Sequence, residues 1–388
     1  MMRYLICFLS FWVSPAVYAQ NQSVTFQKVS EIIGSEWIRK ADSLLLLSPL
    51  TVTSSQCTRS EGGIHDFYSE GDYWWPDPQN PDGPYIRKDG LSNPDNFVDH
   101  RRLMERFNFT AGCLASAYLL TKDEKYAQGA LKHYKAWFLD SMTYMSPHLL
   151  YGQAIKGRVS GRGIGIIDTI HLIEVAKALE VFQNSQSFQP EATAGIKGWF
   201  SQYLTWLRTH PFGIDERDTK NNHSTCWVMQ VGVFAHLLGD QEVIEECRNR
   251  FKEILMPHQM GADGSFPEEL ARTKPYGYSS FNLEAMGIIC QSLSESGENL
   301  WHFSLADGRN MQKALTFFSP YIRDKATWPY QKDVSNFEQH PIAYSFLIFA
   351  YDQLKEPTYF DLWKNLPHFT THTAMVRSSP VRNVLIWL

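Results

Sequence analysis

The sequence has no excess of basic residues. Its 388 residues include 36 Lys and Arg against 41 Asp and Glu, which gives a formal charge of −5 at pH 7. Proteins that bind nucleic acid or anionic membranes through charge carry a basic surplus. The composition therefore predicts neither partner, and a polyanionic ligand would need positive charge gathered locally by the fold.

Cysteines are few, and their spacing argues against two classes of protein. The chain has six, without the regular spacing of a disulfide framework. It contains no Cys-x-x-Cys or His-Glu-x-x-His motif, so we expect neither a structural zinc nor a zincin site, and no other cofactor. We expect most of the five cysteines after Cys7 to be buried as small apolar side chains. One disulfide among these cysteines remains possible.

The sequence also lacks an apolar run as long as a bilayer span, which needs about 20 residues. The apolar stretch Tyr4–Val13 is shorter. It follows Arg3 and precedes the small-residue pattern Val17-Tyr18-Ala19, an arrangement typical of a secretory signal peptide. We interpret residues 1–19 as that signal. We expect residues 20–388 to form an exported protein, periplasmic or secreted, without a membrane span.

Apolar and aromatic residues are abundant. Hydrophobic residues make up 44% of the chain and aromatic residues 14%, which excludes a disordered protein and is enough for a large core. Residues 54–96 differ from the rest because Gly, Pro, Asp, Asn and aromatic residues dominate there. Proline and glycine at this density forbid a long helix, and a loop of this length in a compact domain is usually functional.

From residue 100 onward, apolar residues recur with helical spacing in paired segments. The pairs return at a spacing of roughly 50–60 residues, which is typical of stacked helical hairpins. We predict one all-α domain, an incomplete α/α toroid with the loop at 54–96 over its cleft; an open helical-repeat binder is the alternative. For residues 373–388 we predict a strand or an extended tail. The expected helices are 24–47, 107–120, 126–139, 164–182, 191–209, 226–238, 243–255, 282–293, 310–321 and 341–354.

A polar group precedes the helix expected at 226–238. It consists of Asn221, Asn222 and His223, followed by Ser224. The N-terminus of a helix favours anions, so Asn222 and His223 are candidates to hold a substrate carboxylate. We expect Ser224 to cap the helix, and capping alone is the alternative interpretation of the whole group.

A second group lies in residues 261–278, where Arg272 and Tyr278 flank a turn that contains Pro and Gly. A free tyrosine has a pKa of about 10 and is a poor base at neutral pH. A cation such as Arg272 close by would favour the phenolate, which makes Tyr278 a candidate for proton transfer. A tyrosine on a surface loop is the alternative.

Further polar and basic residues stand on predicted loops. Arg162 lies in the glycine-rich segment 157–165, and Gln153 precedes it. This segment lacks the preceding strand of a dinucleotide fingerprint. Lys274 belongs to the second group. If these loops meet at one mouth of the ring, their cations form a positive groove in an acidic protein.

Several motifs together carry a family resemblance. Asn-Asn-His at 221–223 is followed by Glu-Leu-Ala-Arg at 269–272 and by Tyr278, a fairly specific combination. The segments Asp66–Pro76, Gly83–Gly90 and Gly161–Asp168 add to it. In these motifs the chain resembles the alginate lyase superfamily of polysaccharide lyases, which have α/α toroid folds.

The resemblance implies roles for individual residues. In the family, Asn and His neutralise the uronate carboxylate while Tyr and Arg serve proton transfer, which assigns catalysis to Asn222, His223, Arg272 and Tyr278. Two features depart from polysaccharide lyase family 5: the interval from Arg272 to Tyr278, and Ser279 in place of a His. The interval is more similar to polysaccharide lyase family 38, which includes glucuronan-cleaving members. Tyr276 is the alternative to Tyr278. The predicted substrate contacts are Tyr73, Trp74, Trp75, Tyr85, Gln153, Arg162, Asn221, Lys274 and Tyr276.

The expected reaction is β-elimination on a β-1,4-linked polyuronate, either mannuronate-rich alginate or glucuronan. Tyr278 acts alone where H5 and O4 share a face of the sugar, and His223 is the base where they do not. Two other functions stay open. An inverting glycosidase would use two carboxylates among Asp168, Asp263 and Glu269, and a noncatalytic polysaccharide binder would use the same aromatic residues.

Overall fold

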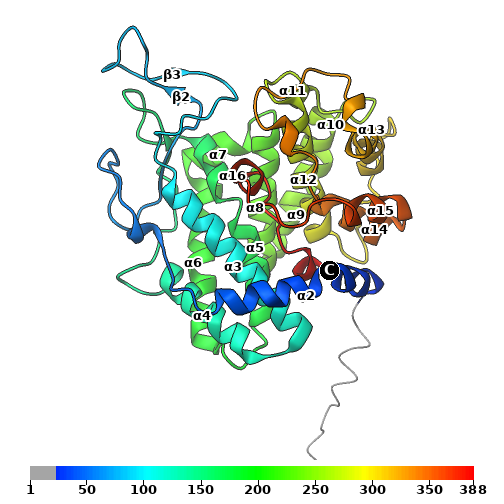
Figure 1. Ribbon diagram of the computed structural model, residues 1–388, viewed down its shortest axis with the longest axis horizontal. Coiled ribbons are helices and arrows are strands. Elements are labelled where there is room, and N and C mark those ends of the chain that lie inside the picture. Colours follow the sequence, from blue (N-terminus) through cyan, green and yellow to red (C-terminus); the bar gives the residue numbers. More distant parts are fainter. Residues whose placement is uncertain (1–22) are drawn as a thin grey trace, which may run out of the picture.

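The computed structural model describes residues 23–388, so the predicted signal peptide at 1–19 lies outside the described residues. Five helices follow one another around a common centre, each packed against the next (Figure 1). They are buried along most of their length, as expected of helices inside a core. These inner helices are α3 (Asp99–Thr121), α5 (Leu172–Phe182), α8 (Asn222–Leu238), α12 (Pro275–Leu293) and α14 (Ser345–Leu354).

A second layer of helices covers the first. α2 and α4 pack on α3, α6 and α9 on α8, α13 on α12, and α15 on α14. α2 also contacts α14 and bridges the gap that the inner helices leave between α14 and α3, as in an incomplete toroid. The all-α toroid prediction is confirmed, and the open-repeat alternative is excluded. The outer helices are α2 (Val24–Leu44), α4 (Glu124–Phe138), α6 (Pro190–Thr209), α9 (Gln241–Arg250), α13 (Met311–Arg323) and α15 (Pro357–Lys364).

Local sequence explains where these helices begin and end. Gly239 adopts a left-handed φ of 73° that ends α8, and the Asp240 side chain then caps α9 by accepting from Val243 N. The helix predicted at 282–293 corresponds to α12, and its predicted start is wrong. Pro275 occupies the first turn of α12 and begins the helix instead of breaking it. Tyr278 therefore lies in the first turns of a helix.

Shorter elements connect the layers. The short α-helices are α7 (Pro211–Arg217), α10 (Met256–Gln259), α11 (Pro267–Leu270) and α16 (Thr373–Arg377). A π-helical segment, Phe251–Leu255, separates α9 from α10. The 3₁₀ helices are Val52–Ser54, Gly163–Thr169, Lys325–Thr327, Phe337–Gln339 and Val384–Trp387.

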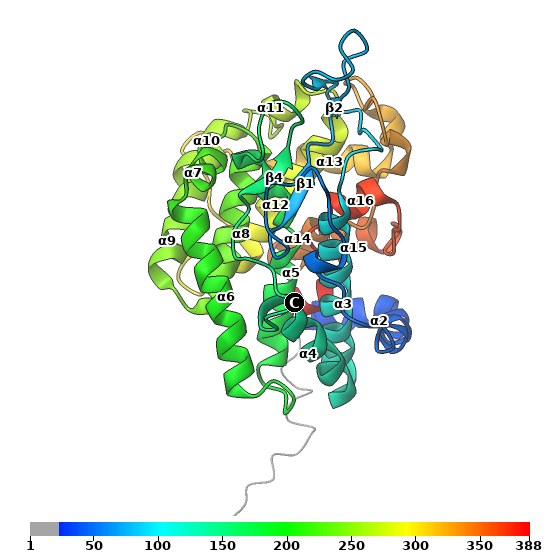
Figure 2. The same ribbon diagram turned by 90° about the vertical axis from the view of Figure 1, so that its left-hand side faces the viewer.

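The long loop carries the strands and stands at one end of the ring. β1 (Tyr68–Glu70) pairs in parallel with β4 (Tyr151–Ala154), and β2 (Trp74–Trp75) pairs antiparallel with β3 (Ile86–Arg87). Figure 2 shows β1 beside β4, with β2 further out beyond the helices. The loop thus lies over one mouth of the ring, as the sequence predicts.

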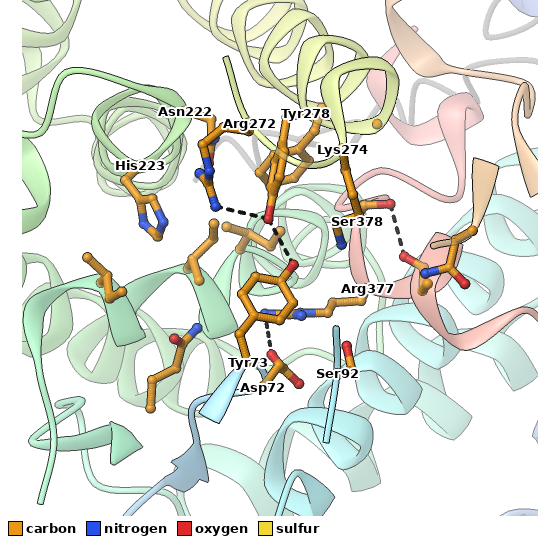
Figure 3. Close-up of a pocket in the computed structure, with 18 of the residues that line it drawn as sticks. Asp72, Tyr73, Ser92, Asn222, His223, Arg272, Lys274, Tyr278, Arg377 and Ser378 are labelled. Atoms are coloured by element: carbon orange, nitrogen blue, oxygen red, sulfur yellow. Dashed lines mark hydrogen bonds and ion pairs between the residues drawn. The ribbon is translucent and has the colours of Figure 1, made fainter. Parts of the chain in front are cut away.

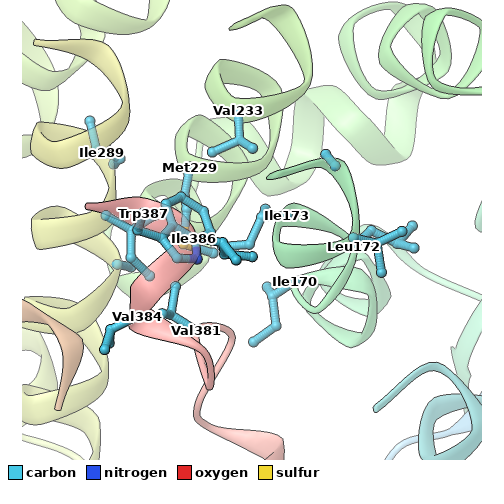
Figure 4. Close-up of a cluster of buried hydrophobic side chains, with 14 of the residues drawn as sticks. Ile170, Leu172, Ile173, Met229, Val233, Ile289, Val381, Val384, Ile386 and Trp387 are labelled. Atoms are coloured by element: carbon cyan, nitrogen blue, oxygen red, sulfur yellow. The ribbon is translucent and has the colours of Figure 1, made fainter. Parts of the chain in front are cut away.

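The C-terminal segment fills the hub of the ring. Val384–Trp387 forms a buried 3₁₀ helix that contacts α2, α3 and α5. Figure 4 shows Ile386 and Trp387 between side chains of α5, α8 and α12. The prediction of a strand or an extended tail at 373–388 is wrong. The apolar side chains at 384–387 occupy consecutive positions and are all buried in the hub. A helical turn presents such consecutive side chains to helices on several sides.

The prediction that most cysteines after Cys7 are buried is confirmed. Cys113, Cys226, Cys247 and Cys290 are buried, Cys57 is half-buried, and all five are free thiols. Within residues 23–388, no helix combines the length and the apolarity needed to cross a membrane.

Candidate active site

A cavity of about 700 Å³ opens at the mouth of the ring beneath the long loop. This volume is in the range of small-molecule and oligosaccharide sites. The N-terminal ends of α3, α8 and α12 line it, together with the segment after β1 and the C-terminal helix α16. Figure 3 shows side chains from these elements pointing toward one another across the cavity.

The N-terminus of α8 presents the Asn-Asn-His group to the cavity. Asn221 caps the helix by accepting from His223 N, at 3.3 Å. The expected cap Ser224 instead donates to the Arg217 carbonyl, at 2.6 Å, so that prediction is wrong. Free N–H groups and the helix dipole make this end attractive to an anion.

Asn222 is held by a buried carboxylate. Glu269 accepts from Asn222 N and from Asn222 Nδ2, both at 2.7 Å. Burial raises the pKa of Glu269 against the effect of these bonds. An amide nitrogen has two hydrogens, so Nδ2 keeps one for a ligand. Both carboxylate oxygens of Glu269 are thus used on Asn222.

His223 is oriented in the same way by Glu216. Its Nδ1 lies 2.8 Å and 3.0 Å from the two carboxylate oxygens of Glu216. The Glu216 side chain is fully buried, and burial raises its pKa. With Nδ1 engaged, Nε2 is the ring nitrogen left for a ligand. The His223 side chain borders the cavity.

Two tyrosine hydroxyls meet on the other side of the cavity. Tyr73 Oη and Tyr278 Oη are 2.8 Å apart, although the residues are 205 positions apart in the chain. Arg272 Nη2 donates to Tyr278 Oη at 3.2 Å, and its guanidinium lies 4.3 Å from the centre of the Tyr278 ring. The predicted proximity of Arg272 to Tyr278 is confirmed. The partner Tyr73 was predicted only as a sugar contact.

The two tyrosines of this pair have opposite pKa shifts. Burial, reinforced by the neighbouring Tyr73, raises the pKa of Tyr278 well above its ordinary value despite Arg272. Burial also opposes ionisation of Tyr73, but Lys274 and Arg377 outweigh it and lower its pKa. Lys274 and Arg377 thus favour ionisation on the Tyr73 side of the pair. Arg272 acts on Tyr278 in the predicted direction, because it lowers the pKa of that hydroxyl, but burial outweighs it.

An ion-pair network fixes the wall that carries Tyr73. Asp72 accepts from Arg101 Nη2 at 2.9 Å and lies 2.5 Å from Arg377 Nη2. Burial would raise the pKa of Asp72, but Arg101 and Arg377 outweigh it and lower it to about 2. Asp72 is therefore ionised at neutral pH and holds two segments distant in sequence at the mouth.

Gln153 forms a strained part of the same wall. Its φ of 50° lies in the left-handed region, which non-glycine residues rarely adopt. Its side-chain oxygen accepts from Arg162 Nη2 at 2.9 Å, and its side-chain nitrogen donates to Asp168 at 3.2 Å. Such strain persists only where surrounding contacts hold it, often at functional sites.

Most of the predicted site residues meet at the cavity. Trp75 and Tyr85 lie on the long loop outside it. Tyr276 is fully buried and packs among Phe318, Trp328 and other rings. It is a core residue, so the predictions that it contacts substrate or replaces Tyr278 are wrong. The predicted residues that line the cavity are Tyr73, Trp74, Gln153, Arg162, Asn221, Asn222, His223, Arg272, Lys274 and Tyr278.

Other cavity residues were not predicted. Arg377 comes from α16, in the segment expected to be a tail, and no local motif marks it. Asp72 stood in a family-like motif without an assigned role. The carboxylates proposed for a glycosidase do not line the cavity: Asp168 is buried and bonded to Ser69, Glu269 is buried behind Asn222, and Asp263 lies elsewhere.

Comparisons with known proteins agree on a family. Residues 51–328 match the family model described as alginate lyase. A crystal structure of an alginate lyase from Bacteroides ovatus is 33% identical, with a TM-score of 0.80, over 94% of this chain and 97% of that chain. A comparison with curated proteins gave no significant match.

More distant structures share the fold. Alginate lyase A1-III from Sphingomonas species A1 is 15% identical over 81% of this chain and 85% of that chain, with a TM-score of 0.51. A histidine-to-alanine variant of A1-III complexed with a tetrasaccharide is 14% identical over 85% and 89% of the two chains, with a TM-score of 0.57. At these identities the likeness concerns the fold alone.

Proposed function

The chain belongs to the alginate lyase family and is a polysaccharide lyase, and from this membership we propose that it cleaves a β-1,4-linked polyuronate, mannuronan or glucuronan. The cut is a β-elimination that leaves an unsaturated uronate at the new end. The observation that carries the proposal is the Tyr73–Tyr278 hydroxyl pair, which shares one cavity with Asn222 and His223.

The first chemical problem is the weak acidity of the C5 proton, because the adjacent carboxylate resists further negative charge. In the proposal, the free Nδ2–H of Asn222 and the Nε2–H of a protonated His223, both at the N-terminus of α8, bind that carboxylate. Their bonds strengthen as the enediolate develops in the transition state. Removing one such donor typically costs about 2.7–4 kcal/mol.

The second problem is the movement of the proton. In the proposal, the C5–H bond breaks and its proton goes to Tyr278 Oη, while the original Tyr278 proton passes to the phenolate of Tyr73. The C4–O4 bond then breaks, and Tyr278 returns a proton to O4. The 2.8 Å contact between the two hydroxyls supports this exchange, and positioned acid–base groups contribute about 10²–10⁴-fold.

Local positive charge is the third requirement in a protein of net charge −5. Arg272, Lys274 and Arg377 all line the cavity. Lys274 Nζ lies 5.1 Å from the centre of the Tyr73 ring and 5.3 Å from that of Tyr278. These cations favour the Tyr73 phenolate and attract the anionic chain.

The single-tyrosine route determines which polyuronates fit. In mannuronate and glucuronate, H5 and O4 lie on one face, where one tyrosine reaches both. In guluronate and galacturonate they lie on opposite faces, which would require His223 as the base. In the proposal His223 binds the carboxylate as the imidazolium, in which Nδ1–H donates to Glu216 and Nε2–H donates to the uronate, while the tyrosine pair moves the proton. We therefore favour mannuronan and glucuronan.

A substrate panel tests the proposal. The full-length mature protein is incubated with mannuronan, guluronan, glucuronan, polygalacturonate and hyaluronan, and ultraviolet absorbance of the unsaturated end is followed. We expect a signal with mannuronan or glucuronan. Absence of product on all five, at concentrations where binding is measured, would contradict lyase action on these polymers and favour a binder.

Two further expectations belong to the proposal. It assigns every step to protein side chains, so EDTA is expected to leave turnover unchanged. The pattern in residues 1–19 supports export to the periplasm or the medium, where a polymer too large to enter the cell is accessible. Cell fractionation with an activity assay tests the second point.

A further inference from the structure

Cations stacked on aromatic rings extend outward from the cavity, and we propose that they form a second binding site for uronate units of the substrate beyond those in the cavity. The inference rests on the proposed function, because it takes the substrate to be a polyuronate. We name this surface the cationic ridge. It consists of Lys88, Lys156 and Arg158 on the rings of Trp75, Tyr85 and Trp74.

Each cation of the ridge has its own ring. Lys88 Nζ lies 4.9 Å from the centre of the Trp75 ring, and Lys156 Nζ lies 5.6 Å from that of Tyr85. The Arg158 guanidinium lies 5.2 Å from the centre of Trp74. A ring under a cation restrains its side chain, so less entropy is lost when the charge binds an anion. These ring faces carry cations, so we assign them to carboxylate binding and not to sugar stacking.

Two chain segments are locked together to build the ridge. Tyr85 N donates to the Lys156 carbonyl at 3.1 Å, and Arg158 Nε donates to the Tyr85 carbonyl at 2.8 Å. Between them, Gly157 has a φ of 74°, and a Cβ there would lie 2.9 Å from Pro84 Cα. Only glycine allows this approach, so the hairpin at 155–159 and the long loop form one unit.

The ridge cations have no acidic partners. Arg87 of the same loop pairs with Asp89 at 2.6 Å, whereas no carboxylate within residues 23–388 forms an ion pair with Lys88, Lys156 or Arg158. Lys156 and Arg158 are exposed. In a chain of net charge −5, this grouping of unpaired cations fits an anionic ligand.

The ridge is continuous with the cavity. Trp74 and Arg162 line the cavity, and the Arg162 guanidinium lies 5.8 Å from the centre of the same Trp74 ring that carries Arg158. Figure 1 shows β2 and β3 projecting past the helices, so the ridge leads away from the ring. A polyuronate carries one carboxylate per sugar, and a long chain leaving the cavity at Trp74 meets the ridge next.

A double variant tests the ridge against a matched control. Lys88→Gln with Lys156→Gln removes two ring-stacked charges, and Lys28→Gln with Lys122→Gln removes two others far from the cavity. Lys28 and Lys122 lie on the rings of Tyr351 and Tyr118. kcat and KM are measured on long-chain mannuronan or glucuronan and on a trisaccharide of the same sugar. Affinity electrophoresis gives binding without turnover.

We expect the ridge variant to lose about tenfold in kcat/KM on the polymer, through KM, because exposed charge pairs are individually weak. Activity on the trisaccharide is expected to stay unchanged, and added salt reduces the difference between variant and wild type. The control variant behaves as wild type. Equal losses on polymer and trisaccharide, or no loss on the polymer, would overturn the ridge. If wild type cleaves no polyuronate, the proposed function fails, and polymer binding that is unchanged in the ridge variant overturns the ridge separately.

Discussion

The mouth of the ring and its hub are built from opposite chemistry, and one segment, residues 373–388, belongs to both. At the mouth, Arg377 joins the ion-pair network around Asp72. In the hub, Val384–Trp387 fills the space between helices with apolar side chains. We therefore expect substitutions at the mouth to change turnover and substitutions in the hub to change folding.

A buried carboxylate connects the two regions. Glu174, on α5, accepts from Arg382 N at 2.6 Å and from the Asn383 side chain. These residues lie between α16 at the mouth and the 3₁₀ helix in the hub. Glu174 therefore ties the segment between the mouth and the hub to α5.

The largest effect is expected in the hub. Trp387→Ala leaves a cavity among packed helices, and truncation of a buried Trp typically costs about 3–5 kcal/mol of unfolding free energy. Urea unfolding measures the loss. Met142→Ala, at a side chain that is 75% exposed, is the control and should change stability by less than about 0.5 kcal/mol. A Trp387→Ala protein as stable as wild type would contradict the hub packing.

The next effect is expected at the mouth. Asn222→Ala removes a donor to the developing enediolate and should lower kcat by about 10²–10³-fold with a smaller change in KM. Steady-state kinetics on the preferred polyuronate measure it. Glu269→Gln keeps the size of the partner and should cost less. A change confined to KM would rule out transition-state stabilisation by Asn222.

The smallest effect concerns pH and the segment between the two regions. Burial raises the pKa of Glu174 to about 7, so the folded state holds a proton that the unfolded state releases at lower pH. This contribution to stability is present below the ordinary pKa of a Glu and is lost as pH rises through 7. Glu174→Gln cannot ionise and should reduce the fall in unfolding free energy between pH 5 and pH 8, on the order of 1 kcal/mol.

Glu105 and Glu284 also have pKa values raised by burial to about 7, so part of the slope should persist in Glu174→Gln. Denaturant unfolding at both pH values, with wild type beside the variant, measures the difference. An unchanged slope would mean that Glu174 does not carry the buried proton.

Local patterns predicted the helical pairs and the Asn-Asn-His group at the start of α8, because helical periodicity and the signals of a helix N-terminus depend on residues close together in the chain. Asn222 and His223 stand beside each other in the chain, and the fold leaves them beside each other. The loop at 54–96 was likewise predicted from its proline and glycine content. These features need no knowledge of distant contacts.

Features that depend on distant contacts were missed. Tyr73 meets Tyr278 only because the long loop crosses the mouth of the ring. Arg377 meets Asp72, 305 positions earlier in the chain, only through the fold. The interval after Arg272 left Tyr276 as the alternative to Tyr278, yet residues two positions apart on a helix face different sides, and Tyr276 faces the core.

Tyr276 and Tyr278 offer the most direct test, because each Tyr→Phe change removes one oxygen atom from the same helix. Tyr278→Phe should keep the wild-type unfolding free energy and lose about 10²–10⁴-fold in kcat for the unsaturated product. Tyr276→Phe, whose hydroxyl donates to the Tyr321 carbonyl in the core, should keep kcat and lose about 0.5–1.5 kcal/mol of stability. Full turnover in Tyr278→Phe, or its loss in Tyr276→Phe, would contradict the assignment of proton transfer to the tyrosine pair at the mouth.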